Sequence, residues 1–253
     1  MKDNHNIGIV GLGTVGSSVV RLINENQKLL LDRSGKNINI VAVSARKKNI
    51  NRPISLRNYE WVDDPLEMAL DPNIDTVIEL IGGENGPALK LAEKVLLNSK
   101  NLVTANKAML AKHGHYLSNI AEKYKANIYY EGAVAGGIPI VKVLREGLSA
   151  NTIYRVYGIL NGTCNFIMSE MEVTDQSFQI TLKKAQNLGI AEANPETDVG
   201  GMDTAHKLAI LSNLSFGILS DIKDIYIEGI KEITLMDITF ARELGYRIKL
   251  LGI

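Results

Sequence analysis

The most informative segment of the chain is Ile7-Gly8-Ile9-Val10-Gly11-Leu12-Gly13-Thr14-Val15-Gly16. Its apolar start predicts a buried strand, and the apolar residues after Val15 recur at helical spacing, so the pattern is strand, tight glycine turn and helix. In such a turn Gly11 permits the bend, Gly13 lets the backbone approach a pyrophosphate, and Gly16 lets helix and strand pack closely. We therefore expect a dinucleotide to contact Gly11, Gly13, Thr14, Val15 and Gly16; the alternative is a glycine turn without a ligand.

The strand expected at residues 38–43 leads into a basic loop, Ser44-Ala45-Arg46-Lys47-Lys48. A site selective for NAD usually has an acidic residue at this point for the ribose hydroxyls, and here cations stand in its place. Arg46 and Lys47, with Lys48 beside them, are thus predicted to bind the 2′-phosphate of NADP through charge-assisted hydrogen bonds. The alternative is an ordinary solvated basic loop.

Strands and helices continue to alternate up to residue 131. Strands are expected at 76–81, 102–105 and 128–130, and helices at 87–97 and 108–124. This order predicts the α/β class, with a Rossmann-type doubly wound parallel sheet in a dinucleotide-binding domain of residues 1–131. Asn106 and Lys107 follow a strand, and ligands bind such sheets at the carboxyl ends of the strands.

Residues 132–253 are expected to form a second, α+β domain. Strands are predicted at 154–160 and 247–253, and helices from Pro139 to Leu144, at 178–188, at 203–214, and after Thr239 to about Tyr246. Because the last apolar run has no cap or polar tail, we expect the natural polypeptide to be longer. The glycine-rich connection before Pro139 offers backbone carbonyls that a monovalent cation could use, although such loops more often simply turn.

The composition excludes several classes of function. Lys plus Arg (28) equals Asp plus Glu (28), so no basic excess indicates nucleic acid or an anionic membrane as a partner. No apolar run approaches the roughly 18 residues of a membrane helix. The polar start Met1–Asn6 predicts no signal peptide, and a single cysteine fits a reducing compartment. We expect a cytoplasmic protein that binds small molecules.

The segment from Glu192 to Lys207 combines acids, glycines and a lysine. Its acids suit the ammonium group of a zwitterionic amino acid better than a phosphorylated substrate; they are Glu192, Glu196, Asp198 and Asp203. Lys107 and Lys207 are the candidates for moving the proton that accompanies hydride transfer. If both reach one pocket, repulsion and desolvation favour the neutral amine. Alone, an Asp203–Lys207 pair would be read as a surface salt bridge.

Cys164 is the one real alternative among the catalytic candidates. A phosphorylating aldehyde dehydrogenase also joins a nicotinamide domain to a second domain, and its nucleophile is a cysteine. A lone cysteine in apolar surroundings is more often a small buried hydrophobe. His206 is expected to be a packing or surface residue, because it does not share the helix face of Lys207.

Five segments together resemble the homoserine dehydrogenase family over essentially the whole chain. They are Gly11–Gly16, Val103-Thr104-Ala105-Asn106-Lys107, Val134-Ala135-Gly136-Gly137-Ile138-Pro139, Gly158-Ile159-Leu160-Asn161-Gly162-Thr163, and the stretch ending in Asp203-Thr204-Ala205-His206-Lys207. The resemblance implies reversible reduction of L-aspartate 4-semialdehyde to L-homoserine with NADPH or NADH, in threonine and methionine biosynthesis. It also implies a homodimer built through the second domain, which then carries catalysis and dimerisation.

The resemblance also assigns roles to individual residues. Lys207 is similar to the acid/base lysine of the family, and Lys107 to the lysine between nicotinamide and substrate. Substrate-holding carboxylates correspond to Glu192, Asp198 and Asp203. The backbone carbonyls that correspond to a sodium or potassium site are those of Glu131, Val134, Gly136 and Ile138.

Three departures from the family pattern carry expectations of their own. Cys164 replaces a second threonine after Asn-Gly-Thr, a near-isosteric change read as packing, and Gly200 replaces a common acid or asparagine, which predicts a looser substrate loop. The family's C-terminal return segment and any regulatory ACT domain are not in the sequence. An inactive, truncated dinucleotide-binding module that acts as a sensor or oligomerisation partner is therefore the alternative function.

Overall fold

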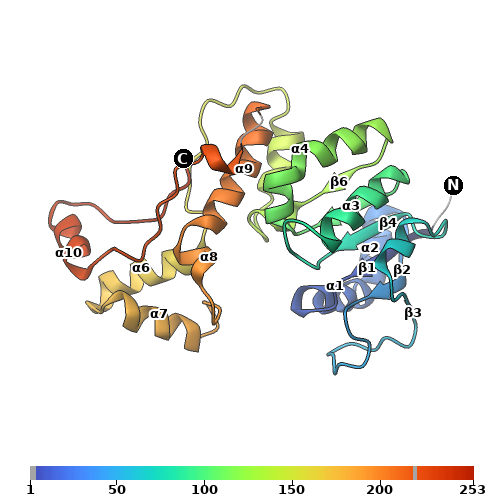
Figure 1. The fold of residues 1–253 in the computed structure, drawn as a ribbon, viewed down its shortest axis with the longest axis horizontal. Helices are drawn as coiled ribbons and strands as arrows, with labels where there is room; N and C mark the ends of the chain where they lie inside the picture. The colour runs from blue at the N-terminus through green and yellow to red at the C-terminus, as the bar shows by residue number, and fades with distance from the viewer. Residues whose placement is uncertain (1–3, 219–220) are drawn as a thin grey trace. The chain divides into compact units, whose positions relative to one another are not determined.

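The computed structural model describes residues 4–218 and 221–253. The chain folds into two compact units, Met1–Gly137 and Ile138–Ile253, each with its own core (Figure 1). The functional boundary after Glu131 stays a prediction. Residues 1–3 of the polar N-terminus lie outside the described residues. Within the described part of the chain, no helix is long and apolar enough to cross a membrane.

The first unit is built on a six-stranded parallel sheet with the order β3-β2-β1-β4-β5-β6. Its strands are β1 (Asn4–Val10), β2 (Asn37–Ser44), β3 (Glu60–Trp61), β4 (Thr76–Glu79), β5 (Asn101–Thr104) and β6 (Ile128–Tyr129). The order runs outward in both directions from β1 and β4, so the chain reverses between these two strands. The predicted Rossmann-type doubly wound sheet is confirmed, and ligands of such sheets bind at this reversal.

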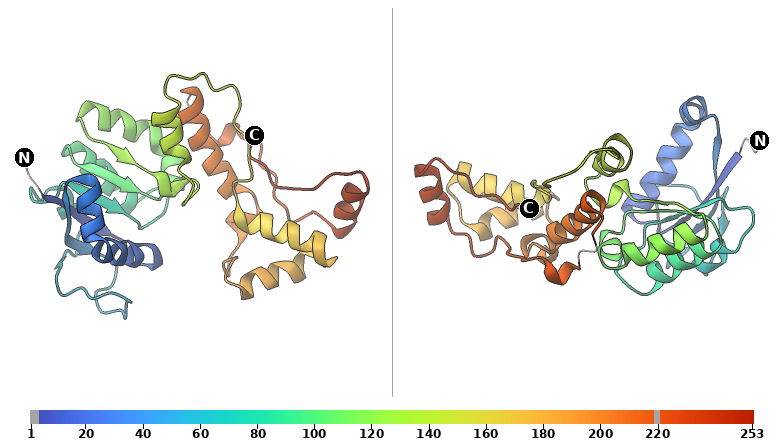
Figure 2. Two further views of the ribbon diagram at one scale, coloured as in Figure 1. Left: turned by 180° about the vertical axis from the view of Figure 1, so that it is seen from behind. Right: turned by 90° about the horizontal axis from the view of Figure 1, so that it is seen from above.

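Helices cover both faces of the sheet. They are α1 (Thr14–Glu25), α2 (Gln27–Ser34), α3 (Pro87–Leu97) and α4 (Lys107–Lys123), with 3₁₀ turns η1 (Pro65–Ala69) and η2 (Glu131–Ala133). Right-handed crossovers that leave the centre in opposite directions place their helices on opposite faces. Figure 2, right, shows this arrangement, with α1 and α2 on one side of the sheet and α3 and α4 on the other.

The second unit is rich in helices. They are α5 (Ile140–Lys142), a π-helical turn η3 (Val143–Gly147), α6 (Gly162–Thr174), α7 (Phe178–Asn187), α8 (Glu196–Val199), α9 (Met202–Phe216), the 3₁₀ turn η4 (Ile222–Asp224) and α10 (Leu235–Glu243). The strands predicted at 154–160 and 247–253 are wrong as strands, because the two segments meet only in one antiparallel bridge between Gly158 and Gly252. One bridge supplies too few ladder hydrogen bonds for a sheet.

Helix α6 was not predicted, and it organises the core of the second unit. Its inner face carries Ile167, Met168 and Met171, which pack with residues of α7, α8 and α10. Full burial stabilises each such side chain by about 1.5–3 kcal/mol. Asn161 caps the helix, since its Oδ1 accepts a hydrogen bond from the amide of Cys164 at 2.8 Å. The cap places the start of α6 beside the acidic segment.

Candidate active site

The glycine turn has the geometry that a pyrophosphate needs. Gly11 has φ +99°, and a Cβ there would lie 2.5 Å from the carbonyl oxygen of Leu80. A Cβ on Gly16 would lie 1.8 Å from the carbonyl oxygen of Gly11, whereas one on Gly13 would meet nothing within 4 Å. The fold therefore requires glycine at positions 11 and 16, because any side chain there would collide with the backbone. Gly13, in contrast, borders open space at the N-terminus of α1. Thr14 and Val15 are exposed beside it, so a dinucleotide fits.

The basic loop is held against this turn by Arg52. Its guanidinium donates hydrogen bonds to the carbonyl oxygens of Lys47 (2.6 Å) and Lys48 (2.9 Å), and its Nε donates to that of Leu12 (3.4 Å). It also lies over the ring of Trp61, as Lys48 does. The backbone is thus fixed while the side chains of Arg46 and Lys47 stay exposed, where they can meet an anionic group.

Asn106 and Lys107 lie at the carboxyl end of β5, as expected. Asn106 is buried and caps α4 by accepting a hydrogen bond from the amide of Met109 at 3.1 Å. Its Nδ2 donates to the carbonyl oxygen of Gly83 at 2.7 Å. Lys107 is the first residue of α4 and is half-buried.

The four residues whose carbonyls are expected to bind a cation lie within residues 131–138 of the sequence. Glu131, Val134 and Gly136 belong to the first unit, and Ile138 is the first residue of the second. The carbonyl of Ile138 accepts a hydrogen bond from the amide of Ile140 at 2.8 Å. Gly136 has φ +58°, which favours glycine.

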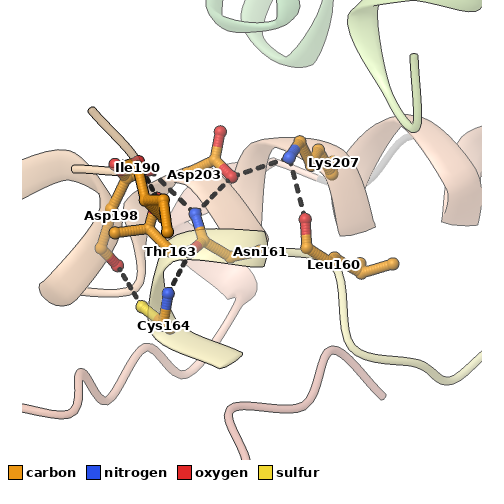
Figure 3. A network of polar contacts seen from close by, with 8 residues as sticks. All are labelled: Leu160, Asn161, Thr163, Cys164, Ile190, Asp198, Asp203 and Lys207. Carbon is orange, nitrogen blue, oxygen red and sulfur yellow. Dashed lines mark hydrogen bonds and ion pairs between the residues drawn. The ribbon is translucent and has the colours of Figure 1, made fainter. Parts of the chain in front are cut away.

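In the second unit, one asparagine joins two acids (Figure 3). The Nδ2 of Asn161 donates to Oδ1 of Asp198 and to Oδ2 of Asp203, both at 2.8 Å. These contacts span 37 and 42 residues of sequence. They join Asp198 of α8 and Asp203 at the start of α9 into a defined pair of carboxylates.

Lys207 completes this group. Its Nζ lies 2.8 Å from Oδ2 of Asp203 and donates to the carbonyl oxygen of Leu160, also at 2.8 Å (Figure 3). The side chain of Asp203 is only 3% exposed and that of Lys207 is 17% exposed, so the pair is not a surface salt bridge. Two of the three ammonium hydrogens are used, and the third has no partner among the residues that the structure describes. A half-buried, oriented ammonium group with one spare donor is suited to act on an oxygen atom.

Glu192 and Glu196 do not join the two aspartates. Glu192 is exposed, and its carbonyl oxygen accepts a hydrogen bond from Nε2 of Gln186 at 3.2 Å. Glu196 forms an exposed ion pair with Lys231. His206 is half-buried on α9. The four acids of the segment therefore divide into an inner pair and an outer pair.

Cys164 lies in the core of the second unit. Its thiol donates to the carbonyl oxygen of Asp198 at 3.2 Å, and the residue has no exposed surface. Burial, together with the charges of Asp198 and Asp203, raises the pKa of Cys164 to about 12. The thiol therefore stays protonated near neutral pH, which is unsuitable for a nucleophile.

The expectation that Gly200 loosens the substrate loop stays a prediction, and the structure shows only the local geometry of this residue. Gly200 ends α8 in a regular turn, and its amide donates to the carbonyl oxygen of Glu196 at 2.9 Å. Gly201 has φ +88° and begins α9. A Cβ on Gly229 would lie 2.8 Å from the Cα of Gly200. The small residues here permit close packing of two backbone segments.

Sequence reasoning assigned no role to Asn161, Leu160 or Arg52. Asn161 directly precedes an apolar run with helical spacing, which is a signal for an N-cap that could have revealed α6. No local signal identifies the carbonyl of Leu160 or the contacts of Arg52, because both depend on residues distant in the sequence.

Comparison with known proteins agrees with these features. A family model for homoserine dehydrogenase matches residues 139–253, and one for the NAD-binding domain of homoserine dehydrogenase matches residues 11–131. A homoserine dehydrogenase of Helicobacter pylori is 48% identical over 255 aligned residues, which cover 100% of this chain and 59% of the relative. The chain thus spans about three-fifths of the length of that relative.

Solved structures show the same likeness. A homoserine dehydrogenase of Thiobacillus denitrificans has a TM-score of 0.93 at 43% identity, with 98% of this chain and 57% of that chain covered. A hyperthermophilic archaeal homoserine dehydrogenase in complex with NADPH has a TM-score of 0.79 at 25% identity, with 91% and 75% covered. A candidate homoserine dehydrogenase of Archaeoglobus fulgidus, 31% identical with a TM-score of 0.87, is covered over 79% of its length, against 98% of this chain. The chain belongs to the homoserine dehydrogenase family.

Proposed function

We propose that this protein reversibly reduces L-aspartate 4-semialdehyde to L-homoserine with NADPH, as homoserine dehydrogenases do. The observation that carries the proposal is the Lys207 ammonium, held by Asp203 and the carbonyl oxygen of Leu160 with one donor to spare. A glycine turn suited to a dinucleotide supports it from the first unit.

The proposed proton transfer takes place at Nζ of Lys207. The nicotinamide, when bound, supplies hydride to the aldehyde carbon. Lys207 donates its spare hydrogen to the carbonyl oxygen and delivers the proton as negative charge develops there. Asp203 keeps the ammonium oriented, and the neutral amine takes a proton from the alcohol in the reverse reaction. Lys107 is proposed to lie between nicotinamide and substrate.

The ammonium end of the substrate is proposed to meet Asp198 and Glu192. Asn161 occupies Oδ1 of Asp198, which leaves Oδ2 of this half-buried carboxylate for a cation. Glu192 is exposed and can approach a bound amino acid from solvent. Pairing of an ammonium group with carboxylates also explains why a phosphorylated substrate would be rejected.

A preference for NADP is proposed on the basis of the basic loop. Arg46 and Lys47 are exposed on a backbone that Arg52 fixes beside the glycine turn, and an arginine suits a phosphate through paired hydrogen bonds. The archaeal relative in complex with NADPH is consistent with this proposal.

A sodium or potassium ion is proposed to bind the carbonyls of Glu131, Val134, Gly136 and Ile138. Support comes from their closeness in the sequence, within residues 131–138, and from the left-handed backbone at Gly136. Rates measured in sodium, potassium or a bulky organic cation test this: equal rates in all three would exclude the ion.

A cytoplasmic homodimer is proposed as the working form. The single cysteine fits a reducing compartment. Tyr154 and Tyr157 are largely exposed on the segment that bridges to Gly252, and exposed aromatic residues are enriched at protein interfaces. Light scattering after gel filtration measures the oligomer directly.

The test of the function is the initial rate of NADPH oxidation on addition of L-aspartate 4-semialdehyde, with NADH compared at equal concentration. We expect turnover without added phosphate. Turnover that requires phosphate and is lost in Cys164→Ser would instead indicate the thiol-dependent reaction. Tight NADPH binding with no turnover would favour an inactive binding module.

A further inference from the structure

Glu79 is a buried acid at the centre of the carboxyl edge of the sheet. It is the last residue of β4, in register with Val10 of β1 on one side and with Thr104 of β5 on the other. The residue is 0% exposed, and it forms no ion pair with any cation among residues 4–218 and 221–253. Burial of an unpaired carboxylate is costly unless hydrogen bonds satisfy it.

Three donors satisfy this carboxylate. Oε1 accepts hydrogen bonds from the amides of Ile81 (2.7 Å) and Gly82 (3.1 Å). Oε2 accepts one from Oγ1 of Thr104 at 2.6 Å. Glu79 therefore holds both the loop that follows its own strand and the end of the neighbouring strand.

The same hydrogen bonds continue into a closed ring. Oγ1 of Thr104 accepts from the amide of Asn106 at 3.0 Å, and Nδ2 of Asn106 donates back to the carbonyl oxygen of Gly83 at 2.7 Å. The ring thus runs from Glu79 through Thr104 and Asn106 to Gly83 and returns along the 79–83 backbone. Lys107 is the next residue in the chain after this ring.

The other end of the ring lies against the glycine turn. The amide of Leu80 donates to the carbonyl oxygen of Val10 at 2.7 Å, and Leu80 is the residue that leaves no room for a Cβ on Gly11. A single buried carboxylate therefore links the turn expected to hold the pyrophosphate to the turn that carries Lys107.

We propose that Glu79 is a positioning residue that sets the place of Lys107 relative to the bound cofactor, an inference that rests on the proposed function. An apolar residue at this position would leave three donors unsatisfied, whereas the carboxylate orders them at once. Displacement of a catalytic group by about 1 Å can cost roughly a hundredfold in rate. A glutamate that touches neither substrate nor cofactor can therefore control turnover.

The experiment uses Thr104, because its hydroxyl is the link between Glu79 and Asn106. Thr104→Val keeps the volume and removes the hydroxyl, whereas Thr104→Ser keeps the hydroxyl and removes a methyl group. The matched control is Thr76→Val, since Thr76 is also buried and also bonded through Oγ1, to His5 at 2.9 Å, at the opposite end of β4. NADPH affinity, kcat, KM and amide hydrogen exchange are measured for each variant.

We expect Thr104→Val to lower kcat about tenfold or more, with faster exchange at the amide of Asn106. Thr104→Ser and Thr76→Val should stay close to the unaltered protein. A merely structural role would make serine, which leaves a void, at least as harmful as valine, and that result overturns the proposal. So does unchanged exchange at Asn106 in Thr104→Val.

Glu79→Gln provides the second test. The amide keeps one acceptor but turns a donor toward the hydroxyl or the two backbone amides, so exchange at Ile81, Gly82 and Asn106 should rise together. If the unaltered protein shows no turnover at all, the proposed function is wrong. The pattern of amide exchange still tests whether the hydrogen-bonded ring connects Glu79 to Asn106. A variant in which only Ile81 and Gly82 exchange faster would refute the link to Lys107.

Discussion

The ammonium of Lys207 lies 2.8 Å from Oδ2 of Asp203, one turn earlier on α9, and both side chains are largely withdrawn from water. A pair that the sequence alone would leave as a surface salt bridge is thus a half-buried ammonium group oriented by a buried carboxylate. Desolvated charges interact more strongly than exposed ones but must remain paired. Changes to either residue should therefore have effects well beyond those of a surface pair.

Lys207→Ala should abolish most turnover and leave NADPH binding unchanged. The lysine supplies the proton in the proposed reaction, and general acid catalysis contributes roughly a hundredfold to ten-thousandfold. Steady-state rates and a fluorescence titration with NADPH measure the two quantities separately. Asp203→Asn is the companion variant, expected to lower kcat by disturbing the ammonium. Retained turnover in Lys207→Ala would rule out the lysine as the proton donor.

Asn161→Asp should separate helix capping from the bridging of the two acids. Aspartate caps a helix about as well as asparagine, so α6 keeps its cap. The change places a third carboxylate between Asp198 and Asp203, where like charges repel. We expect lower activity at neutral pH and partial recovery as the pH falls and one carboxyl group is protonated. If the rate of the variant has the same pH dependence as that of the unaltered protein, the proposed role of Asn161 in bridging the two aspartates is contradicted.

Asn161→Ser is the control for this experiment. Serine also caps helices, but its hydroxyl cannot donate to two carboxylates at once. Both variants keep the N-cap of α6. If this cap is the only contribution of residue 161 to stability, the serine and aspartate variants should have similar thermal unfolding temperatures.

Cys164 should take no part in catalysis and should not react with thiol reagents at neutral pH. Burial and the two aspartates raise its pKa to about 12, above the 9.0 that is ordinary for a thiol. Since the folded state keeps the proton, this group favours folding below pH 9 and that contribution is lost between pH 9 and 12. Cys164→Ser should keep turnover, and iodoacetamide labelling should accelerate only on unfolding. Rapid labelling of the native protein at pH 7 would show that the thiol is exposed.

The double change Arg46→Ala and Lys47→Ala should raise the KM for NADPH by about tenfold or more and change that for NADH little. These side chains are proposed to meet the 2′-phosphate, which NADH lacks. The ratio of kcat/KM for the two cofactors is the measurement. An equal loss of kcat/KM with both cofactors would mean that the loop shapes the cofactor site in general and does not bind the 2′-phosphate.

Gly13→Ala should weaken NADPH binding, whereas Gly16→Ala should lower the stability of the fold. A Cβ on Gly13 meets open space, so the variant should fold but bind NADPH weakly, because the methyl group occupies the approach of the pyrophosphate. A Cβ on Gly16 would lie 1.8 Å from the carbonyl oxygen of Gly11, so that variant should lose stability. Thermal unfolding without cofactor distinguishes the two, and equal losses of stability would refute the reading of Gly13.

Features that depend on neighbours along the chain could be predicted from the order of the residues. The glycine turn, the alternation of strands and helices up to residue 131, and the i,i+4 spacing of Asp203 and Lys207 follow from local periodicity and from the backbone freedom of glycine. The Rossmann-type sheet could be predicted on these grounds alone.

The contacts between distant polar groups, in contrast, became known from the folded structure. Asn161 reaches Asp198 and Asp203 across 37 and 42 residues, and Glu79 reaches Thr104 across 25. Glu196, predicted beside these acids, pairs with Lys231 instead, 35 residues away. Partners at such separations are selected by burial, because a buried polar group must find whichever donor or acceptor the packed elements bring to it. Residue order does not encode that choice.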